Sequence, residues 1–211
     1  MLIYLVRHGE SVTNRTGQFA GQIDVSLTEL GEKQAACVTE FFKDIPLTAV
    51  YSSDLSRAMN TVAGVAAYHG LTVTPEPQLR EIFAGEWEGM VFEELPKRYP
   101  EAFGVWQSDI GNARCTGGES VSEAVYRADA ALRRIAEKHS QGNVVVASHG
   151  GIVRGLLSLW TTGGTAAMQQ LSWTPNASGN EIEWNNGEFC GVRAAITEHL
   201  GELVTELPKT V

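Results

Sequence analysis

The strongest constraint on the fold comes from two segments in which a run of apolar residues ends at a His-Gly pair. One is MLIYLVRHG (1–9) and the other is GNVVVASHGG (142–151). Neither run alternates with polar residues, which is typical of a strand buried on both faces of a sheet. Since such strands must be covered on both sides, we expect helices on both faces of a largely parallel sheet.

The intervening segments supply further elements of an α/β fold. Apolar residues recur at helical spacing in three segments: 28–43, 54–68 and 120–139. Ser120 and Glu123 form a capping-box pattern, and Asp54 or Ser53 is expected to cap the helix that follows them. Strands are expected in 47–53 and 71–77, a helix after 151, and a hairpin around 186–187.

We therefore predict one domain, residues 1–211, with a three-layer α/β/α sandwich. Its sheet is mostly parallel with an antiparallel edge strand. Residues 82–118 are irregular, with a short helix around 92–103, and are expected to form an inserted lid. The aromatic residues of this insert either pack it onto the sheet or line a pocket for an apolar leaving group: Phe83, Trp87, Phe92, Tyr99, Phe103 and Trp106.

Charge and composition exclude several classes of partner. The net charge of −9 argues against general binding to nucleic acid or to a membrane surface. No apolar run reaches the roughly 18 residues that span a bilayer, and no basic region precedes the first strand as in a secretory signal. The three cysteines are expected to be free thiols in a reducing cytoplasm. The tryptophan-containing C-terminal third is a possible homodimer face.

The two histidines at the strand ends define a candidate site. If the two strands are parallel neighbours, His8 and His149 lie at the same edge of the sheet, where α/β proteins bind ligands. Arg7 adjoins His8, and Arg57 lies in the first turn of a helix after another strand. Glu81 follows a fourth strand-like segment and is either a counter-ion or a proton donor.

This set of residues suits phosphoryl transfer. Guanidinium groups match tetrahedral oxyanions such as phosphate. A histidine among cations has its pKa lowered, so one ring nitrogen of His8 stays free to attack. Arg7, Arg57 and His149 would stabilise the charge on the transferring phosphoryl group, and Glu81 would protonate the leaving oxygen and later activate water.

Other phosphate chemistries lack their motifs. The sequence contains no Cys-x5-Arg, no D-x-D, no phosphate-binding P-loop and no G-x-S-x-G. A zinc site from His8, Glu81 and His149 is disfavoured because Arg7 would repel the metal. We expect no metal and no cofactor, and Gly9 is expected to bring backbone close to the phosphate.

Several separated motifs resemble those of the histidine phosphatase superfamily, also called phosphoglycerate mutase-like. The motifs are LVRHGES (5–11), Asn14, Gly21 with Asp24, LT (27–28) with Gly31, SSDLSRA (52–58), LRE (79–81) with Gly85, WEG (87–89), GGES (117–120) and SHGG (148–151). The resemblance runs from residue 2 to about 157 and extends toward 199–200.

The resemblance implies a role for each matching position. His8 would be the phosphorylated nucleophile and Glu81 the acid/base, with no metal. The catalytic set would also include Arg7, Arg57 and His149, which contact the phosphate. Further substrate-binding positions would be Asn14, Gly21, Gly150 and Ala20. Relatives often carry a polar Thr or Gln where this chain has Ala20, so only a backbone contact is expected there.

The family contains both phosphatases and mutases. A mutase must hold a second phosphate and a carboxylate, yet residues 82–118 contain only Lys97, Arg98 and Arg114 against six acidic residues. LREIFAGEWEG and GGES resemble the small-molecule phosphatase branch, which includes broad-specificity and α-ribazole phosphatases. We therefore expect a metal-independent phosphatase of a small phosphorylated metabolite, with mutase as the alternative. A non-catalytic binding module is least favoured because His8, Glu81 and His149 are all present.

Overall fold

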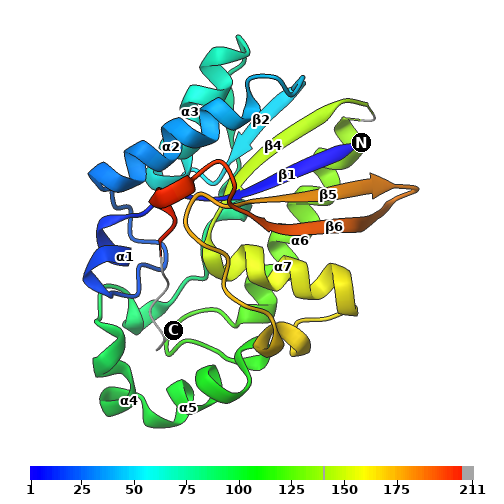
Figure 1. Ribbon diagram of the computed structural model, residues 1–211. Helices are drawn as coiled ribbons and strands as arrows, with labels where there is room; N and C mark the ends of the chain where they lie inside the picture. The colour runs from blue at the N-terminus through cyan, green and yellow to red at the C-terminus, as the bar shows by residue number, and fades with distance from the viewer. Residues whose placement is uncertain (140, 206–211) are drawn as a thin grey trace.

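A six-stranded sheet forms the centre of the computed structural model, which describes residues 1–139 and 141–205 (Figure 1). The strands are β1 (Leu2–Arg7), β2 (Ala49–Ser52), β3 (Val73–Pro75), β4 (Asn143–Ser148), β5 (Gly179–Asn185) and β6 (Glu188–Ile196). Their order is β3-β2-β4-β1-β5-β6, with β1 to β4 mutually parallel and β5 antiparallel to β1 and β6. The predicted mostly parallel sheet with an antiparallel edge is confirmed, and the predicted hairpin forms that edge.

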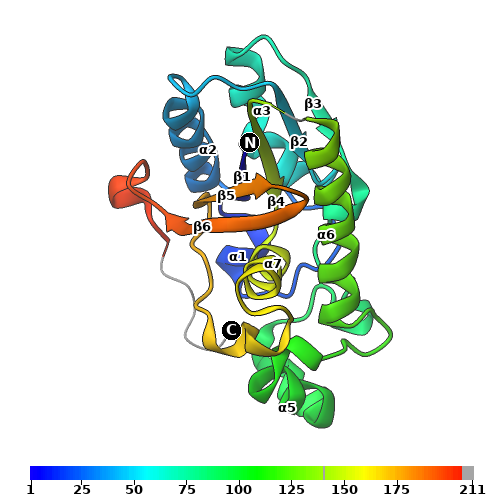
Figure 2. The same ribbon diagram turned by 90° about the vertical axis from the view of Figure 1, so that its right-hand side faces the viewer.

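Helices cover both faces of the sheet. They are α1 (Val12–Thr16), α2 (Glu29–Phe42), α3 (Ser56–Tyr68), α4 (Leu95–Arg98), α5 (Pro100–Ser108), α6 (Val121–Lys138) and α7 (Gly150–Thr162). Short 3₁₀ turns lie at Pro77–Leu79, Gly85–Trp87, Phe92–Glu94, Ile110–Asn112, Ala166–Gln170 and Gly201–Leu203. Figure 2 shows the strands between α2 on one side and α6 on the other. Within the described residues, no helix is long and apolar enough to cross a membrane.

The pleat of β1 explains why both faces need helices. Ile3 and Leu5 join one apolar cluster with side chains of α6 and α7, whereas Tyr4 and Val6 join a second cluster with side chains of α2 and α3. All four side chains are buried. Successive side chains of a strand point to opposite faces, so this apolar run is satisfied only in a three-layer arrangement.

The predicted N-terminal cap is present at α6 and absent at α3. The capping box of α6 is present, with Ser120 Oγ accepting from Glu123 N at 3.2 Å and Glu123 Oε2 accepting from Ser120 N at 2.9 Å. The expected Ser53 or Asp54 cap of α3 is wrong, because Leu55 is the N-cap residue and provides no side-chain cap. Both expected side chains are engaged elsewhere, since Ser53 bonds to His149 and Asp54 pairs with Arg80.

Residues 82–118 fold over the carboxyl end of the sheet and contribute to its core. Trp87, Phe103 and Trp106 are buried in the cluster that includes Ile3 and Leu5, so these aromatic side chains pack the segment onto the domain. The single helix expected around 92–103 is two helices, α4 and α5. Pro100 begins the second one, where its missing N–H and fixed φ are tolerated.

Candidate active site

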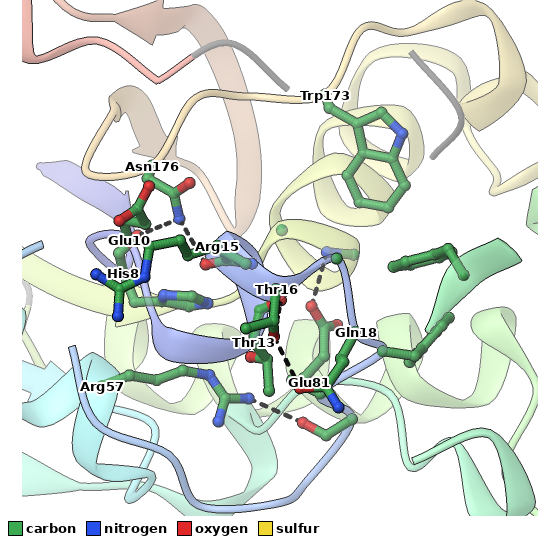
Figure 3. Close-up of a pocket in the computed structure, with 18 of the residues that line it drawn as sticks. His8, Glu10, Thr13, Arg15, Thr16, Gln18, Arg57, Glu81, Trp173 and Asn176 are labelled. Atoms are coloured by element: carbon green, nitrogen blue, oxygen red, sulfur yellow. Dashed lines mark hydrogen bonds between the residues drawn. The ribbon is translucent and has the colours of Figure 1, made fainter. Parts of the chain in front are cut away.

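A cavity of about 480 Å³ opens at the carboxyl ends of β1 and β4. Figure 3 shows that His8, Arg57 and Glu81, which come from separate parts of the chain, all lie at this cavity. Nearly all the predicted site residues line it: Arg7, His8, Asn14, Ala20, Gly21, Arg57, Glu81 and Gly150. His149 is the exception, because it is fully buried beside the cavity with its ring 5.1 Å from the ring of His8.

His8 follows directly on β1, and within the described residues only one of its two ring nitrogens is hydrogen-bonded. Arg7 pairs with Ser148 across β1 and β4, and the next N–H, that of His8, donates to the Ser148 carbonyl at 3.0 Å. His8 Nδ1 lies 2.6 Å from the Gly9 carbonyl oxygen, so Nδ1 carries the proton and donates it. Burial, followed by the charges of Arg57 and Arg7, holds the pKa of His8 well below its usual range. The ring is therefore neutral, with an unprotonated Nε2.

Gly9 is needed for the packing of two backbone segments. A Cβ at this position would lie 2.7 Å from the carbonyl oxygen of Gly31, at the start of α2. Gly9 is not among the residues that line the cavity. The small residue is therefore required by the close approach of two backbone segments, and this approach fixes the loop that carries His8.

Arg7 presents a buried donor without a partner. Its side chain donates from Nη1 to the Thr174 carbonyl at 2.5 Å, while Nε has no hydrogen-bond partner in the described part of the chain. Burial lowers the pKa of Arg7 to about 10, with Glu81 opposing the shift and Arg57 adding to it. A buried unpaired donor is costly unless a ligand satisfies it. Gly150 leaves space for this group, because a Cβ there would lie 3.1 Å from Arg7 Cζ.

Arg57 is the second buried cation and links Gly21 to His149. It donates from Nη2 to the Gly21 carbonyl at 2.8 Å, from Nη1 to the Ile23 carbonyl at 2.7 Å and from Nε to His149 Nδ1 at 3.2 Å. Burial lowers the pKa of Arg57, although Glu81 opposes this shift. The backbone carbonyl of Gly21 therefore holds the Arg57 guanidinium group in place.

His149 is neutral and anchored at both ring nitrogens. Because Nδ1 accepts from Arg57, Nε2 carries the proton and donates to Ser53 Oγ at 2.8 Å. Burial, followed by the charge of Arg57, holds the pKa of His149 well below its usual range. His149 thus fixes the orientation of Arg57 from behind the cavity wall.

Glu81 lies opposite the arginines on an irregular segment. Its Oε1 accepts from Ile82 N and its Oε2 from Gly151 N, both at 3.0 Å. A Cβ at Gly151 would lie 2.7 Å from Oε1, so a glycine at the start of α7 is needed for the carboxylate to reach this position. The carboxylate faces the cavity that His8 and the arginines also line.

Asn176 is a site residue that carried no signal in the sequence. Its Nδ2 donates to the His8 carbonyl and to Asn14 Oδ1, both at 3.1 Å. Asn14 Oδ1 also accepts from the backbone N–H and the hydroxyl of Ser11. With its oxygen occupied in this way, Asn14 can offer its Nδ2 to a ligand. Asn176 lies in the loop before β5, in a segment without a motif.

The outer part of the cavity combines aromatic and charged side chains. Phe19, Phe92, Trp106 and Trp173 line it, and Arg154 stacks on the Trp173 ring at 4.6 Å. Charged groups also line it: Glu10, Arg15 and Glu93. Phe92 and Trp106 come from the segment 82–118, so this segment also contributes to the pocket.

The described residues contain no group of three or more His, Cys, Asp or Glu side chains that could hold a metal ion. The charged groups nearest the two site histidines are instead arginines. This set of side chains is suited to an anion, because guanidinium groups donate to oxyanions and repel cations.

Comparisons with known proteins identify a family. The profile of the histidine phosphatase superfamily (branch 1) matches residues 3–197. Phosphoserine phosphatase 1 of Hydrogenobacter thermophilus is 31% identical over 99% of both chains. Phosphoglycerate mutase-like protein 4 of Arabidopsis thaliana is 39% identical over 73% of this chain and 68% of its own. The solved structure of Bacillus stearothermophilus YhfR is 26% identical, covers 94% of this chain and 98% of its own, and has a TM-score of 0.89.

Proposed function

Because the chain belongs to the histidine phosphatase superfamily, we propose that it hydrolyses phosphate monoesters of small molecules through a phosphohistidine on His8. One observation carries the proposal. His8, with an unprotonated Nε2, lines the same cavity as the buried Arg7, whose Nε has no partner within the described residues. A nucleophile and an unsatisfied oxyanion donor are the two parts that phosphoryl transfer requires.

In the proposed complex, the phosphate lies between the two arginines. Arg7 Nε and the guanidinium of Arg57 would contact its oxygens, and Asn14 Nδ2 would add a neutral donor. His149 keeps Arg57 in place through the 3.2 Å hydrogen bond to Nε. Two guanidinium groups offset the charge of a phosphate dianion, and this compensation increases as charge develops in the transition state.

In the first step, His8 Nε2 attacks phosphorus as the bond to the leaving oxygen breaks. The carboxyl group of Glu81 gives its proton to that oxygen, which departs as an alcohol. The hydrogen bond from Nδ1 to the Gly9 carbonyl disperses the positive charge that develops on the ring. The products are a phosphohistidine, a free alcohol and an ionised Glu81.

In the second step, water attacks the phosphohistidine. Glu81, now a carboxylate, takes one proton from that water as the N–P bond breaks, and the electron pair returns to His8 Nε2. Inorganic phosphate leaves, and Glu81 is again protonated for the next cycle. Every proton in this scheme is transferred by Glu81 or water, and no metal is needed.

Mutase activity is the second candidate, because several relatives are named phosphoglycerate mutase-like protein or probable phosphoglycerate mutase. A mutase must hold a second phosphate and a carboxylate in the same cavity. Besides Arg7 and Arg57, the only cationic side chain among the described cavity residues is Arg15, and Glu10 and Glu93 also line the cavity. The charge of the outer cavity therefore favours hydrolysis of a singly phosphorylated substrate.

A substrate screen with matched variants tests the proposal. The purified protein would be assayed with p-nitrophenyl phosphate, phosphoserine, α-ribazole phosphate and 3-phosphoglycerate, with and without EDTA. We expect the protein to hydrolyse at least one of these esters at a rate that EDTA does not change. This activity should be abolished in His8→Ala and retained in the control His69→Ala. His69 lies at the end of α3, away from the cavity, where its ring bonds to the Phe42 carbonyl. Undiminished turnover in His8→Ala, or a faster mutase reaction that depends on 2,3-bisphosphoglycerate, would contradict the proposal.

A further inference from the structure

Glu81 lies on backbone that has no regular hydrogen-bonded structure of its own. The 3₁₀ turn Pro77–Leu79 ends two residues before it, and the next turn begins at Gly85. Such a segment keeps one conformation only if other parts of the molecule satisfy its backbone groups. Two charged side chains, Arg127 of α6 and Glu119 just before α6, satisfy several of these backbone groups. Gln22 Nε2 adds a further hydrogen bond to the Glu81 carbonyl at 3.0 Å.

Arg127 contacts the backbone on the N-terminal side of the Glu81 side chain. Its Nη1 donates to the carbonyls of Gln78 at 2.7 Å and Arg80 at 2.8 Å. Its Nη2 donates to the carbonyl of Glu81 itself at 2.8 Å. Three carbonyls of one short segment thus converge on a single planar group, which fixes their relative positions.

Glu119 contacts the backbone on the C-terminal side. Its Oε1 accepts from Phe83 N at 2.7 Å, and its own N–H donates to the Phe83 carbonyl at 2.9 Å. The same carboxylate accepts from Arg127 Nη2 at 2.6 Å and Nε at 3.1 Å. The side chains of Arg127 and Glu119 are only 19% and 18% exposed, so this bidentate pair is shielded from water.

We propose that Arg127 and Glu119 are positioning residues that set the orientation of the Glu81 carboxyl group for proton transfer. The inference rests on the proposed function, in which Glu81 is the acid and base. Glu81 is bracketed by contacts at residues 80, 81 and 83, and neither Arg127 nor Glu119 lines the cavity itself. A proton donor misplaced by about 1 Å loses on the order of 10²-fold in rate.

This role predicts a dependence on the leaving group that a purely structural ion pair would not produce. p-Nitrophenolate leaves without being protonated, whereas the phenolate of phenyl phosphate needs a proton from the general acid. Variants that misplace Glu81 should therefore lose kcat/KM on phenyl phosphate and largely keep it on p-nitrophenyl phosphate. The ratio of the two values is independent of the fraction of protein that is folded.

The variants are Arg127→Met, Arg127→Lys and Glu119→Gln, with Arg133→Met as the matched control. Arg133 lies on the same helix and forms an ion pair with Asp129, with side-chain exposures of 35% and 12%. It also donates to the Gly187 carbonyl, far from Glu81 in the chain. Glu81→Gln serves as the reference for complete loss of the acid.

Arg127→Met should raise the ratio of kcat/KM on p-nitrophenyl phosphate to that on phenyl phosphate by about 10- to 100-fold. Arg127→Lys and Glu119→Gln should raise it by less, because each keeps part of the contacts, and Arg133→Met should leave it unchanged. A rise of roughly 10²- to 10⁴-fold in Glu81→Gln with no rise in the Arg127 and Glu119 variants would overturn the positioning role alone. No rise in Glu81→Gln would overturn the proposed role of Glu81.

Discussion

Lowering the pH should destabilise the folded protein through its two active-site histidines. His8 and His149 are both buried in the folded state, and their pKa values lie well below the ordinary value. In the unfolded chain they return to a pKa of about 6.5 and take up protons as the pH falls. Their contribution to stability is therefore fully present above about pH 6.5 and is lost below it, toward the folded-state pKa.

The size of the effect follows from proton linkage. A histidine that stays neutral when folded and has an unfolded pKa of about 6.5 costs about 1.4 kcal/mol of unfolding free energy between pH 7.5 and 5.5. Two such histidines give about 2.7 kcal/mol. That loss is a large fraction of the stability of an ordinary domain, which is roughly 5–15 kcal/mol.

Urea unfolding at several pH values would measure this loss. The wild-type unfolding free energy should fall by at least about 2.7 kcal/mol between pH 7.5 and 5.5, since burial also lowers the pKa of His139 and His199. His8→Asn should lose about 1.4 kcal/mol less than the wild type over that range. Inorganic phosphate should raise the wild-type unfolding free energy at each pH, because a bound anion stabilises the folded state. An equal pH dependence in wild type and His8→Asn would refute the assignment of a neutral, buried His8.

Two substitutions, with Gly104→Ala as a control, test the geometry of the phosphate pocket. Gly150→Ala places a methyl group 3.1 Å from Arg7 Cζ and should lower kcat/KM on p-nitrophenyl phosphate about tenfold, through a weakened charge-assisted hydrogen bond. The control is Gly104→Ala in α5, where an added Cβ would have no atom within 4 Å. This variant should keep the wild-type kcat/KM and gain about 0.5–1 kcal/mol in unfolding free energy. Equal kcat/KM in the Gly150 and Gly104 variants would contradict this pocket geometry. Asn176→Ala removes the donor to Asn14 and the His8 carbonyl, and should raise the inhibition constant of inorganic phosphate about tenfold; an unchanged constant would show that Asn14 is oriented without it.

The fold could be predicted because its strongest signals are local. The unbroken apolar runs at 1–6 and 144–147 require cover on both faces, and the amphipathic pattern of 120–139 identifies α6 with its capping box. The carboxyl ends of parallel strands meet at one edge of the sheet, where ligands bind, so the sequence also predicts that His8 lies beside His149. The parallel pairing of β1 with β4 brings the two rings together in this way. Both predictions use residues that are close in sequence to a recognisable element.

The remaining features depend on contacts that no local pattern encodes. Asn176 reaches His8 across 168 positions, and Arg127 reaches the Glu81 carbonyl across 46. The cap of α3 was mispredicted for a related reason, because a distant partner, His149, engages Ser53. A side chain whose local hydrogen bond competes with a buried tertiary one cannot be assigned from its neighbours in sequence.

Trapping the covalent intermediate is the most direct test of whether His8 is the nucleophile. Radiolabelled p-nitrophenyl phosphate would be mixed with the enzyme, quenched in alkali within the first turnover, and the labelled residue identified by peptide mapping. We expect an acid-labile, alkali-stable phosphate on His8 that is absent from His8→Gln. The label should persist longer in Glu81→Gln, because the water that removes it lacks a base. Label on another residue, or unlabelled protein during undiminished turnover, would contradict the account.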